Sequence, residues 1–186
     1  MTGRLDDAAL TVLRTAHTAD LTTGELGEIR ALLDEAFAGD ITDDDLEHAL
    51  GGVHVLVRER AELVAHGSVV MRRLLHQGRA LRTGYVEAVA VRSDRRRRGH
   101  GSAVMEQLER VIRAAYQLGA LGASDDGIPF YAARGWQQWT GTASVVTPDG
   151  LVRTQEEEGF IYVLPVTAGL NPDADLACDW RDGDVW

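Results

Sequence analysis

The chain has 186 residues, which suits one domain and is long enough to bury a hydrophobic core without disulfides or metals. Hydrophobic residues make up 45% and charged residues 26%, and the formal net charge is -10, so nucleic acid could be bound only through a local basic patch. The one cysteine, Cys178, excludes an intrachain disulfide and favours the reducing cytoplasm.

Neither a membrane span nor a metal site is indicated. No apolar run approaches the roughly 18 residues that a membrane-spanning helix needs. The N-terminal residues lack the apolar core of a signal peptide. The six histidines are scattered and have no zinc-site spacing. We therefore expect no membrane partner and no metal.

The first part of the chain predicts one strand and two helices. Residues 1–10 are expected to form a loose terminus, and alternation over 11–17 predicts a strand. Thr22 and Glu25 have the spacing of a capping box, which predicts the start of a helix. Residues 42–48, with acids in the first turn, predict a second, short helix.

The middle of the chain changes to a period of two. Segments 53–57, 62–75 and 80–92 are separated by turn-like sequences and predict an antiparallel meander of three strands. Apolar residues then recur at helical spacing over 103–115, which predicts a long amphipathic helix that ends by Gly119.

The remaining residues predict a mixture of strands, one helix and a tail. A strand is expected at 118–122, a helix near 126–133, and strands within 136–147 and 160–166. The tail, 167–186, is polar and acidic and is expected to be irregular. Because no repeat or linker interrupts the order β-α-α-β-β-β-α-β-α-β-β, the fold class is α/β, and the whole chain, residues 1–186, is expected to be a single domain.

The run "VRSDRRRRGHGSA", residues 91–103, joins the strand at 80–92 to the long helix. Its R-x-x-G-x-G pattern consists of Arg96, Gly99 and Gly101. Glycines at a helix start let a ligand approach the backbone, and the unpaired N–H groups favour an anion such as a pyrophosphate. An arginine run alone is more often a solvated face or a nucleic-acid patch. The strand-loop-helix context favours the phosphate reading, although neither a Rossmann nor a Walker A pattern is present.

Several segments of the sequence resemble a known superfamily. "VEAVAVRSDRRRRGHGSAVMEQLE" resembles the acetyl-CoA signature of the GCN5-related N-acetyltransferases (GNAT), and "FYAARGW" at 130–136 resembles their closing motif. "AFAGDITDDDLEHALGG", "RALRTGYVEAVAVR", "RAAYQLGAL" and "CDWRDGDVW" are similar to the aminoglycoside 2′-N-acetyltransferases. The resemblance implies a mixed, mostly antiparallel sheet flanked by helices. It also implies acetyl-CoA as cofactor, direct acetyl transfer to the 2′-amine of an aminoglycoside, antibiotic resistance and a homodimer.

The resemblance also implies where the cofactor binds. The strand before the loop is expected to hold the pantetheine arm, and the amides around Arg97 to Ser102 the pyrophosphate. A backbone N–H near Val89 is expected to donate to the developing oxyanion. The expected cofactor-binding residues are Val89, Ala90, Val91, Arg96, Arg97, Arg98, Gly99, Gly101 and Ser102.

Two residues are candidates for proton transfer. Glu87 interrupts the apolar strand "YVEAVAV", where a carboxylate is costly unless it is paired, solvated or used. Simple alternation places it on one face with Tyr85, Val89 and Val91. The resemblance favours Glu87 as general base, through a water, or as an anchor of the amine, over a structural pair with an arginine. It favours Tyr131 as the acid that protonates the leaving thiolate, over a half-buried aromatic.

Acidic clusters elsewhere admit two interpretations. Acids at helix starts complement the dipole and charged loops are usually solvated, yet carboxylates also suit a polycationic substrate. The resemblance selects as substrate-binding residues Asp40, Asp45, Glu87, Glu157, Asp184 and Trp186 with its terminal carboxylate. The tail would then complete the pocket rather than fray.

Some features depart from the resembling enzymes, and two alternatives stay open. Gly122 stands where they often carry a serine, so a substrate hydrogen bond could be missing or supplied by Ser124. The chain could acetylate another polyamine or amino sugar. It could also be a non-enzymatic protein that binds cationic sugars or nucleic acid.

Overall fold

A long antiparallel hairpin organises the fold. The computed structural model describes residues 11–186, so the terminus at 1–10 lies outside the described residues. In the hairpin, β3 (Glu62–His76) pairs with β4 (Arg79–Val91). The turn residues Gln77 and Gly78 both have positive φ, as the tight hairpin turns that match strand twist require.

The predicted three-strand meander is confirmed. β2 (Val53–Glu59) pairs antiparallel with β3 on the side away from β4, and β1 (Thr11–His17) pairs with β2. Between β1 and β2 lie the two expected helices, α1 (Thr23–Ala36) and α2 (Asp43–His48). Both begin with capping boxes. The local sequence alone therefore predicts where they start.

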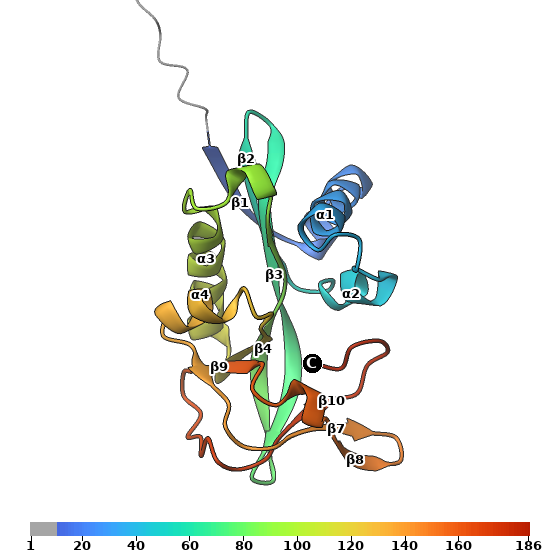
Figure 1. The fold of residues 1–186 in the computed structure, drawn as a ribbon, viewed down its shortest axis with the longest axis vertical. Coiled ribbons are helices and arrows are strands. Elements are labelled where there is room, and N and C mark those ends of the chain that lie inside the picture. Colours follow the sequence, from blue (N-terminus) through green and yellow to red (C-terminus); the bar gives the residue numbers. More distant parts are fainter. Residues whose placement is uncertain (1–10) are drawn as a thin grey trace, which may run out of the picture.

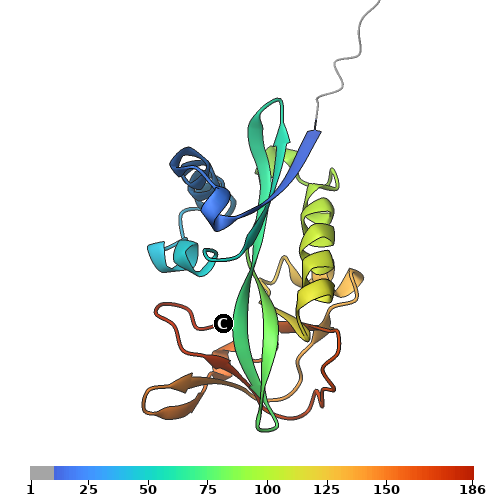
Figure 2. The same cartoon turned by 180° about the vertical axis from the view of Figure 1, so that it is seen from behind.

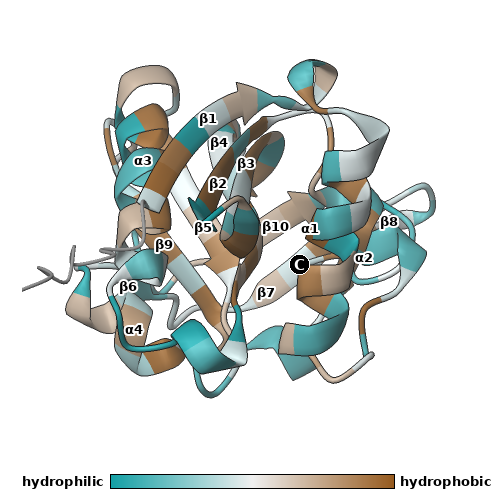
Figure 3. Cartoon of the chain, turned by 90° about the horizontal axis from the view of Figure 1, so that it is seen from above, coloured by the Kyte–Doolittle hydropathy of each residue, from teal (hydrophilic) through white to brown (hydrophobic). Residues whose placement is uncertain are grey.

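The helices cover both faces of the sheet. α3 (His100–Ala115) and α4 (Ile128–Ala133) lie on one face, and α1 and α2 on the other (Figures 1 and 2). α3 begins at His100, three residues before the expected start, because the loop glycines already belong to its N-terminus. Seen from above, the apolar residues concentrate on the central strands and on the helix faces turned to them (Figure 3). The central strands are therefore buried from both sides, whereas β1 is largely exposed.

Ten strands form one mixed sheet within residues 11–186. The main path runs β6-β9-β5-β4-β3-β10-β7-β8, and only β4/β5 and β7/β10 are parallel pairs. The strands not yet introduced are β5 (Leu118–Gly122), β6 (Gln137–Gln138), β7 (Ala143–Thr147), β8 (Gly150–Arg153), β9 (Ile161–Pro165) and β10 (Leu176–Asp179). In the same part of the chain, no helix is long and apolar enough to cross a membrane.

Two expectations for the C-terminal part are wrong. The tail contains β10, which lies between β3 and β7 and buries Leu176, Ala177 and Cys178. The polar average of the tail hides this short strand. The segment 136–147 is not one strand, since β6 and β7 pair with different neighbours, and β8 was missed because Leu151 and its neighbours are exposed.

Candidate active site

The site lies where β4 separates from β5. The two strands pair only from Thr83 opposite Leu118 to Tyr85 opposite Ala120, whereas β4 continues to Val91. Past Tyr85, the backbone of β4 on this side is not used in the ladder with β5. Backbone N–H and C=O groups that leave a ladder need other partners, and a ligand can supply them.

A β-bulge in β4 overturns the predicted alternation. Glu87 pairs with Ser68 and Ala90 with His66, so two residues of β4 oppose one of β3, and Ala88 has φ 52°. A bulge reverses the alternation. Tyr85 packs in the cluster around Trp186, and Ala90 against α1, whereas Val89 and Val91 pack toward α3. Glu87 and Val89 therefore do not share a face.

Glu87 is nearly buried and lies beyond Tyr85, the last residue of β4 that pairs with β5. Its side chain is 14% exposed, and Oε1 accepts a hydrogen bond from Nη1 of Arg181 at 2.5 Å. Burial raises the pKa of Glu87 to about 7, although Arg181 and Arg72 lower it, and Asp184 raises it further. The arginine pair that sequence reasoning weighed is therefore present, yet the carboxyl still titrates near neutrality, where a general base is effective.

Arg181 joins Glu87 to the end of the chain. Its Nη2 donates to an oxygen of the terminal residue Trp186 at 2.6 Å, and its Nε donates to the Asp184 carbonyl at 2.7 Å. Trp186 is 4% exposed, and its indole N–H donates to Thr154. Arg181 therefore holds Trp186 beside Glu87. Sequence reasoning missed Arg181, although a single cation among the acids of "CDWRDGDVW" was a visible signal.

A buried phenol lies under this cluster. The ring of Tyr85 lies 4.7 Å from the Arg72 guanidinium carbon and 5.6 Å from that of Arg181, which are cation–π distances. Its hydroxyl is buried and has no hydrogen-bond partner among residues 11–186. A Cβ added at Gly122 would lie 3.7 Å from that hydroxyl, an ordinary contact. The fold would therefore accept a serine at 122.

The other predicted substrate residues differ in position. Glu157 ends a short 3-10 helix, and burial together with Asp184 raises its pKa, which places these two acids near each other and near the chain end. Asp40 is exposed after α1. Asp45 uses Oδ2 to cap α2, accepting from the Thr42 amide and hydroxyl at 2.8 Å. Asp45 therefore already has a structural role.

A pocket of about 300 Å³ lies between α2 and the tail. His48 donates to the Asp182 carbonyl at 2.8 Å, which ties the two elements together. The pocket is lined by Asp44, Glu47, His48, Arg181 and Asp182. Three of these five are acids, so this pocket extends the carboxylate-rich surface next to Glu87.

Tyr131 lies on the other face of β4. It is 8% exposed in α4 and packs with Trp136 in the core on the α3 side. Burial raises its pKa to about 12, so the phenol stays protonated at neutral pH and can only donate its proton there. β4 thus runs between the candidate acid and the candidate base.

The arginine run divides into paired and free members. Arg92 pairs with Glu62 and Asp94, and Arg95 with Glu59 and Asp94. Arg96 turns back to the Val91 and Ala36 carbonyls at 3.4 Å. Arg97 and Arg98 are exposed and make no ion pair with the described residues. Two guanidinium groups are therefore available to phosphates.

The start of α3 fits a phosphate group. The residue before α3 is Gly99, with φ 85°, and no side chain caps the helix, unlike α1 and α2. His100 in the first turn pairs with Glu59 at 2.8 Å, which fixes the helix end to β2. Gly101 and Ser102 lie in the same turn. Uncapped N–H groups, together with the helix dipole, favour an anion. The residues predicted to bind acetyl-CoA at this helix start could therefore hold the pyrophosphate of the cofactor.

We predict that neutralising Arg97 and Arg98 together weakens CoA binding. Charge-assisted hydrogen bonds contribute about 1.5–3 kcal/mol each, so Arg97→Gln/Arg98→Gln should raise the dissociation constant of CoA at least ~10-fold. Calorimetric titration measures it. Arg110→Gln, an exposed arginine bonded only to Gln107, is the control. Equal affinity in the double variant would assign both arginines to the solvated surface.

Residues 11–186 contain no group of three or more His, Cys, Asp or Glu side chains that could hold a metal ion.

Comparison with known proteins identifies relatives of both sequence and fold. The family model of the acetyltransferase (GNAT) domain matches residues 17–139. An aminoglycoside 2′-N-acetyltransferase of Mycolicibacterium fortuitum is 51% identical over 177 residues, which cover 93% of this chain and 91% of that protein. The match therefore includes the loop, Glu87 and most of the remaining chain.

Two solved structures share the fold at low identity. A GNAT family acetyltransferase from Brucella melitensis in complex with acetyl-CoA has a TM-score of 0.61 and 15% identity, covering 94% of this chain and 97% of that chain. An acyl-CoA N-acyltransferase from Pseudomonas aeruginosa has a TM-score of 0.58 and 18% identity, covering 83% and 99%. The expected fold class is confirmed.

Proposed function

Because the chain belongs to the GNAT family of acetyltransferases, we propose that it transfers the acetyl group of acetyl-CoA directly to the 2′-amino group of aminoglycosides and so confers resistance to them. The observation that carries this proposal is the buried cluster of Glu87, Arg181 and Trp186. This cluster lies beside the part of β4 that no longer pairs with β5. The aminoglycoside 2′-N-acetyltransferase of M. fortuitum, 51% identical, supports the choice of acceptor.

The cofactor would be held along β4 and at the start of α3. Acetyl-CoA supplies an activated acyl group as a thioester. The backbone of Val89, Ala90 and Val91 would pair with its pantetheine arm. The uncapped turn at Gly99 to Ser102, with Arg97 and Arg98, would bind its phosphates. This arrangement would bring the thioester to the bulge of β4, next to Glu87.

Each step of the transfer has a candidate group. Glu87, as carboxylate, would accept the proton that the amine loses as the new N–C bond forms, directly or through a water. The Val89 N–H would donate to the thioester oxygen as that atom gains negative charge. Tyr131 would give its proton to the sulfur as the C–S bond breaks. Every proton then has a donor and an acceptor, and no covalent enzyme intermediate is needed.

The acceptor would be bound by carboxylates. Asp184 lies near both Glu87 and Glu157, and Arg181 bonds both Glu87 and an oxygen of Trp186. Together with Asp40 and the acids of α2, these groups would form the surface that the acceptor meets. An aminoglycoside carries several ammonium groups, and charge-assisted hydrogen bonds would orient it. Nucleic-acid binding is disfavoured, since Arg92 and Arg95 of the arginine run are already paired with acids.

The test compares two kanamycins that differ chiefly at the 2′ position. Free thiol release from acetyl-CoA should occur with the 2′-amine form and not with the 2′-hydroxyl form. Equal turnover of both would discard 2′ specificity. CoA binding without turnover of either would favour another polyamine or amino sugar, and no CoA binding would remove the acetyltransferase proposal.

We predict that Arg181→Met shifts the pH profile of the enzyme. Glu87 faces Arg181, Arg72, Asp184 and Tyr85. Because Arg181 lowers the pKa of Glu87, its loss should move the acidic limb of kcat/KM upward by roughly one pH unit. Arg79→Met, at the exposed hairpin turn, is the matched control. An unmoved limb would show that the base is not Glu87.

We also propose a homodimer in the cytoplasm, with the domain extending over residues 1–186. The buried free thiol of Cys178 suits a reducing compartment.

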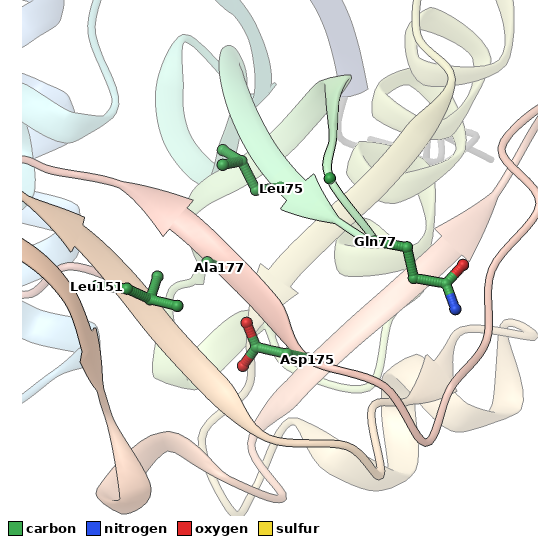
Figure 4. Close-up of a pocket in the computed structure, with 6 residues that line it drawn as sticks. Leu75, Gln77, Leu151, Asp175 and Ala177 are labelled. Atoms are coloured by element: carbon green, nitrogen blue, oxygen red, sulfur yellow. The ribbon is translucent and has the colours of Figure 1, made fainter.

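A pocket of about 340 Å³ lies between the end of β3 and β8, flanked by the partly exposed Leu75 and the exposed Leu151 (Figure 4). Two exposed leucines beside this pocket, one of them on the edge strand β8, support a subunit contact. Light scattering, which measures mass in solution, tests the dimer.

A further inference from the structure

Two buried histidines lie behind the bulge of β4. His54 on β2 is 1% exposed and His66 on β3 is 0% exposed. His54 Nδ1 lies 3.0 Å from His66 Nε2, and His66 Nδ1 lies 2.9 Å from the carbonyl oxygen of Ala88. At the other end, the Thr18 hydroxyl lies 2.8 Å from His54 Nε2. The four residues form one continuous chain of hydrogen bonds that ends on the bulge.

The acceptor at the end of this chain determines the position of each proton. A carbonyl oxygen only accepts, so His66 Nδ1 must carry a hydrogen. Burial lowers the pKa of His66 to about 3 and that of His54 to about 4, so both rings are neutral. His66 Nε2 is then an acceptor, and His54 Nδ1–H donates to it. Thr18 in turn donates to His54 Nε2, so every hydrogen bond runs toward Ala88.

The bulge explains why side chains of β3 bond the carbonyl groups of Glu87 and Ala88. Because the ladder is broken at Ala88, β3 holds the carbonyls with side chains instead. Ser68 donates to the Glu87 carbonyl at 3.4 Å and His66 to that of Ala88. Buried backbone groups that leave a ladder need such partners. The conformation of Ala88, with φ 52°, is unfavourable for a residue with a Cβ and persists only where its surroundings hold it.

The peptide bond transmits this restraint to the next residue. In a trans peptide, C=O and N–H point in opposite directions. No described peptide bond is cis. With the Ala88 carbonyl held toward His66, the Val89 N–H points away from β3. That N–H is the donor that the proposed function assigns to the developing oxyanion, so its direction depends on His66.

We propose that His66 is a positioning residue, which, supported by His54 and Thr18, aims the Val89 N–H at the thioester oxygen through its bond to the Ala88 carbonyl. The inference rests on the proposed function, because it assumes that Val89 is the donor. The proposal makes acetyl transfer depend on a buried chain of hydrogen bonds through Thr18, His54 and His66, which lies away from the acceptor surface.

A matched pair of amides tests the role of His66. In His66→Asn the side-chain nitrogen takes the place of Nδ1 and can still donate to Ala88. In His66→Gln the nitrogen takes the place of Nε2 and cannot. The readout is the infrared frequency of the labelled carbonyl of bound acetyl-CoA, measured without acceptor. In the wild type a hydrogen bond lowers that frequency relative to free acetyl-CoA.

We expect His66→Asn to keep the lowered frequency and His66→Gln to lose most of it. The CoA dissociation constant should change less than about threefold in both, while kcat falls on the order of tenfold or more only in His66→Gln. A lowered frequency retained in His66→Gln would overturn the proposal. If His66→Gln does not fold, His54→Leu, which removes the donor to His66, should show the same loss. A retained shift there would also overturn it.

Failure of the proposed function would look different. If wild-type enzyme binds acetyl-CoA without lowering the carbonyl frequency, the Val89 assignment is wrong whatever His66 does. If it does not bind acetyl-CoA, the acetyltransferase proposal itself fails. A wild-type shift that survives in His66→Gln, or in His54→Leu where His66→Gln does not fold, contradicts the positioning role alone.

Discussion

Glu87→Gln is expected to lower kcat/KM by about 10²–10⁴-fold, the usual contribution of a general base. Burial raises the pKa of Glu87 to about 7, so the carboxylate form that accepts a proton dominates only above that pH. The wild-type rate should therefore fall as pH decreases through about 7. The glutamine cannot ionise, so the variant should lose this limb.

The measurement is kcat/KM between pH 5.5 and 9 with the 2′-amine kanamycin. Glu106→Gln, an exposed acid on α3, serves as the matched control and should keep the wild-type profile. A Glu87→Gln enzyme that is slow but keeps the acidic limb would reduce Glu87 to an anchor of the amine. An unchanged rate would remove it from the mechanism.

Tyr131→Phe is expected to slow acetyl transfer by about 10²-fold or more, because the thiolate would leave without an acid. With a pKa of about 12, the phenol stays protonated throughout the assay, so no basic limb below pH 9 should come from it. Its hydroxyl makes no hydrogen bond with the described residues, so the loss of the oxygen should cost little stability.

The decisive comparison for Tyr131 is rate against affinity. kcat should fall while the CoA dissociation constant and the melting temperature stay close to wild type. Tyr116→Phe, at the end of α3, is the control, since Tyr116 also packs beside the α3 core and has no assigned role. Parallel loss of CoA affinity and rate in Tyr131→Phe would assign the hydroxyl to cofactor binding instead.

Local patterns in the sequence predicted the features that depend on neighbouring residues. The capping box at Thr22 and Glu25 set the start of α1, and alternation predicted the hairpin of β3 and β4. Strand, glycine-rich loop and amphipathic helix follow one another directly in the chain, so the uncapped helix start at Gly99 could be predicted without a structure. Each of these signals involves residues within a single helix, strand or loop, because caps and periodicity are short-range effects.

Long-range contacts decided the rest. Alternation failed at Ala88 because the bulge depends on how β3 opposes β4, and β10 was missed because its stability comes from pairing with β3 and β7.

Three further features could be read only from the folded structure. They are which arginines of the run 91–103 are paired with acids, the capping role of Asp45, and the position of Arg181. Arg181 and Glu87 are 94 positions apart, and the carboxyl's pKa depends on burial that exists only after folding. The sequence by itself determined most of the helices and strands, although not β8 and β10, and the glycine-rich loop before α3. Only the tertiary structure decided which charges are paired, where β4 bulges at Ala88, and that Arg181 links Glu87 to Trp186, because distant segments create those environments.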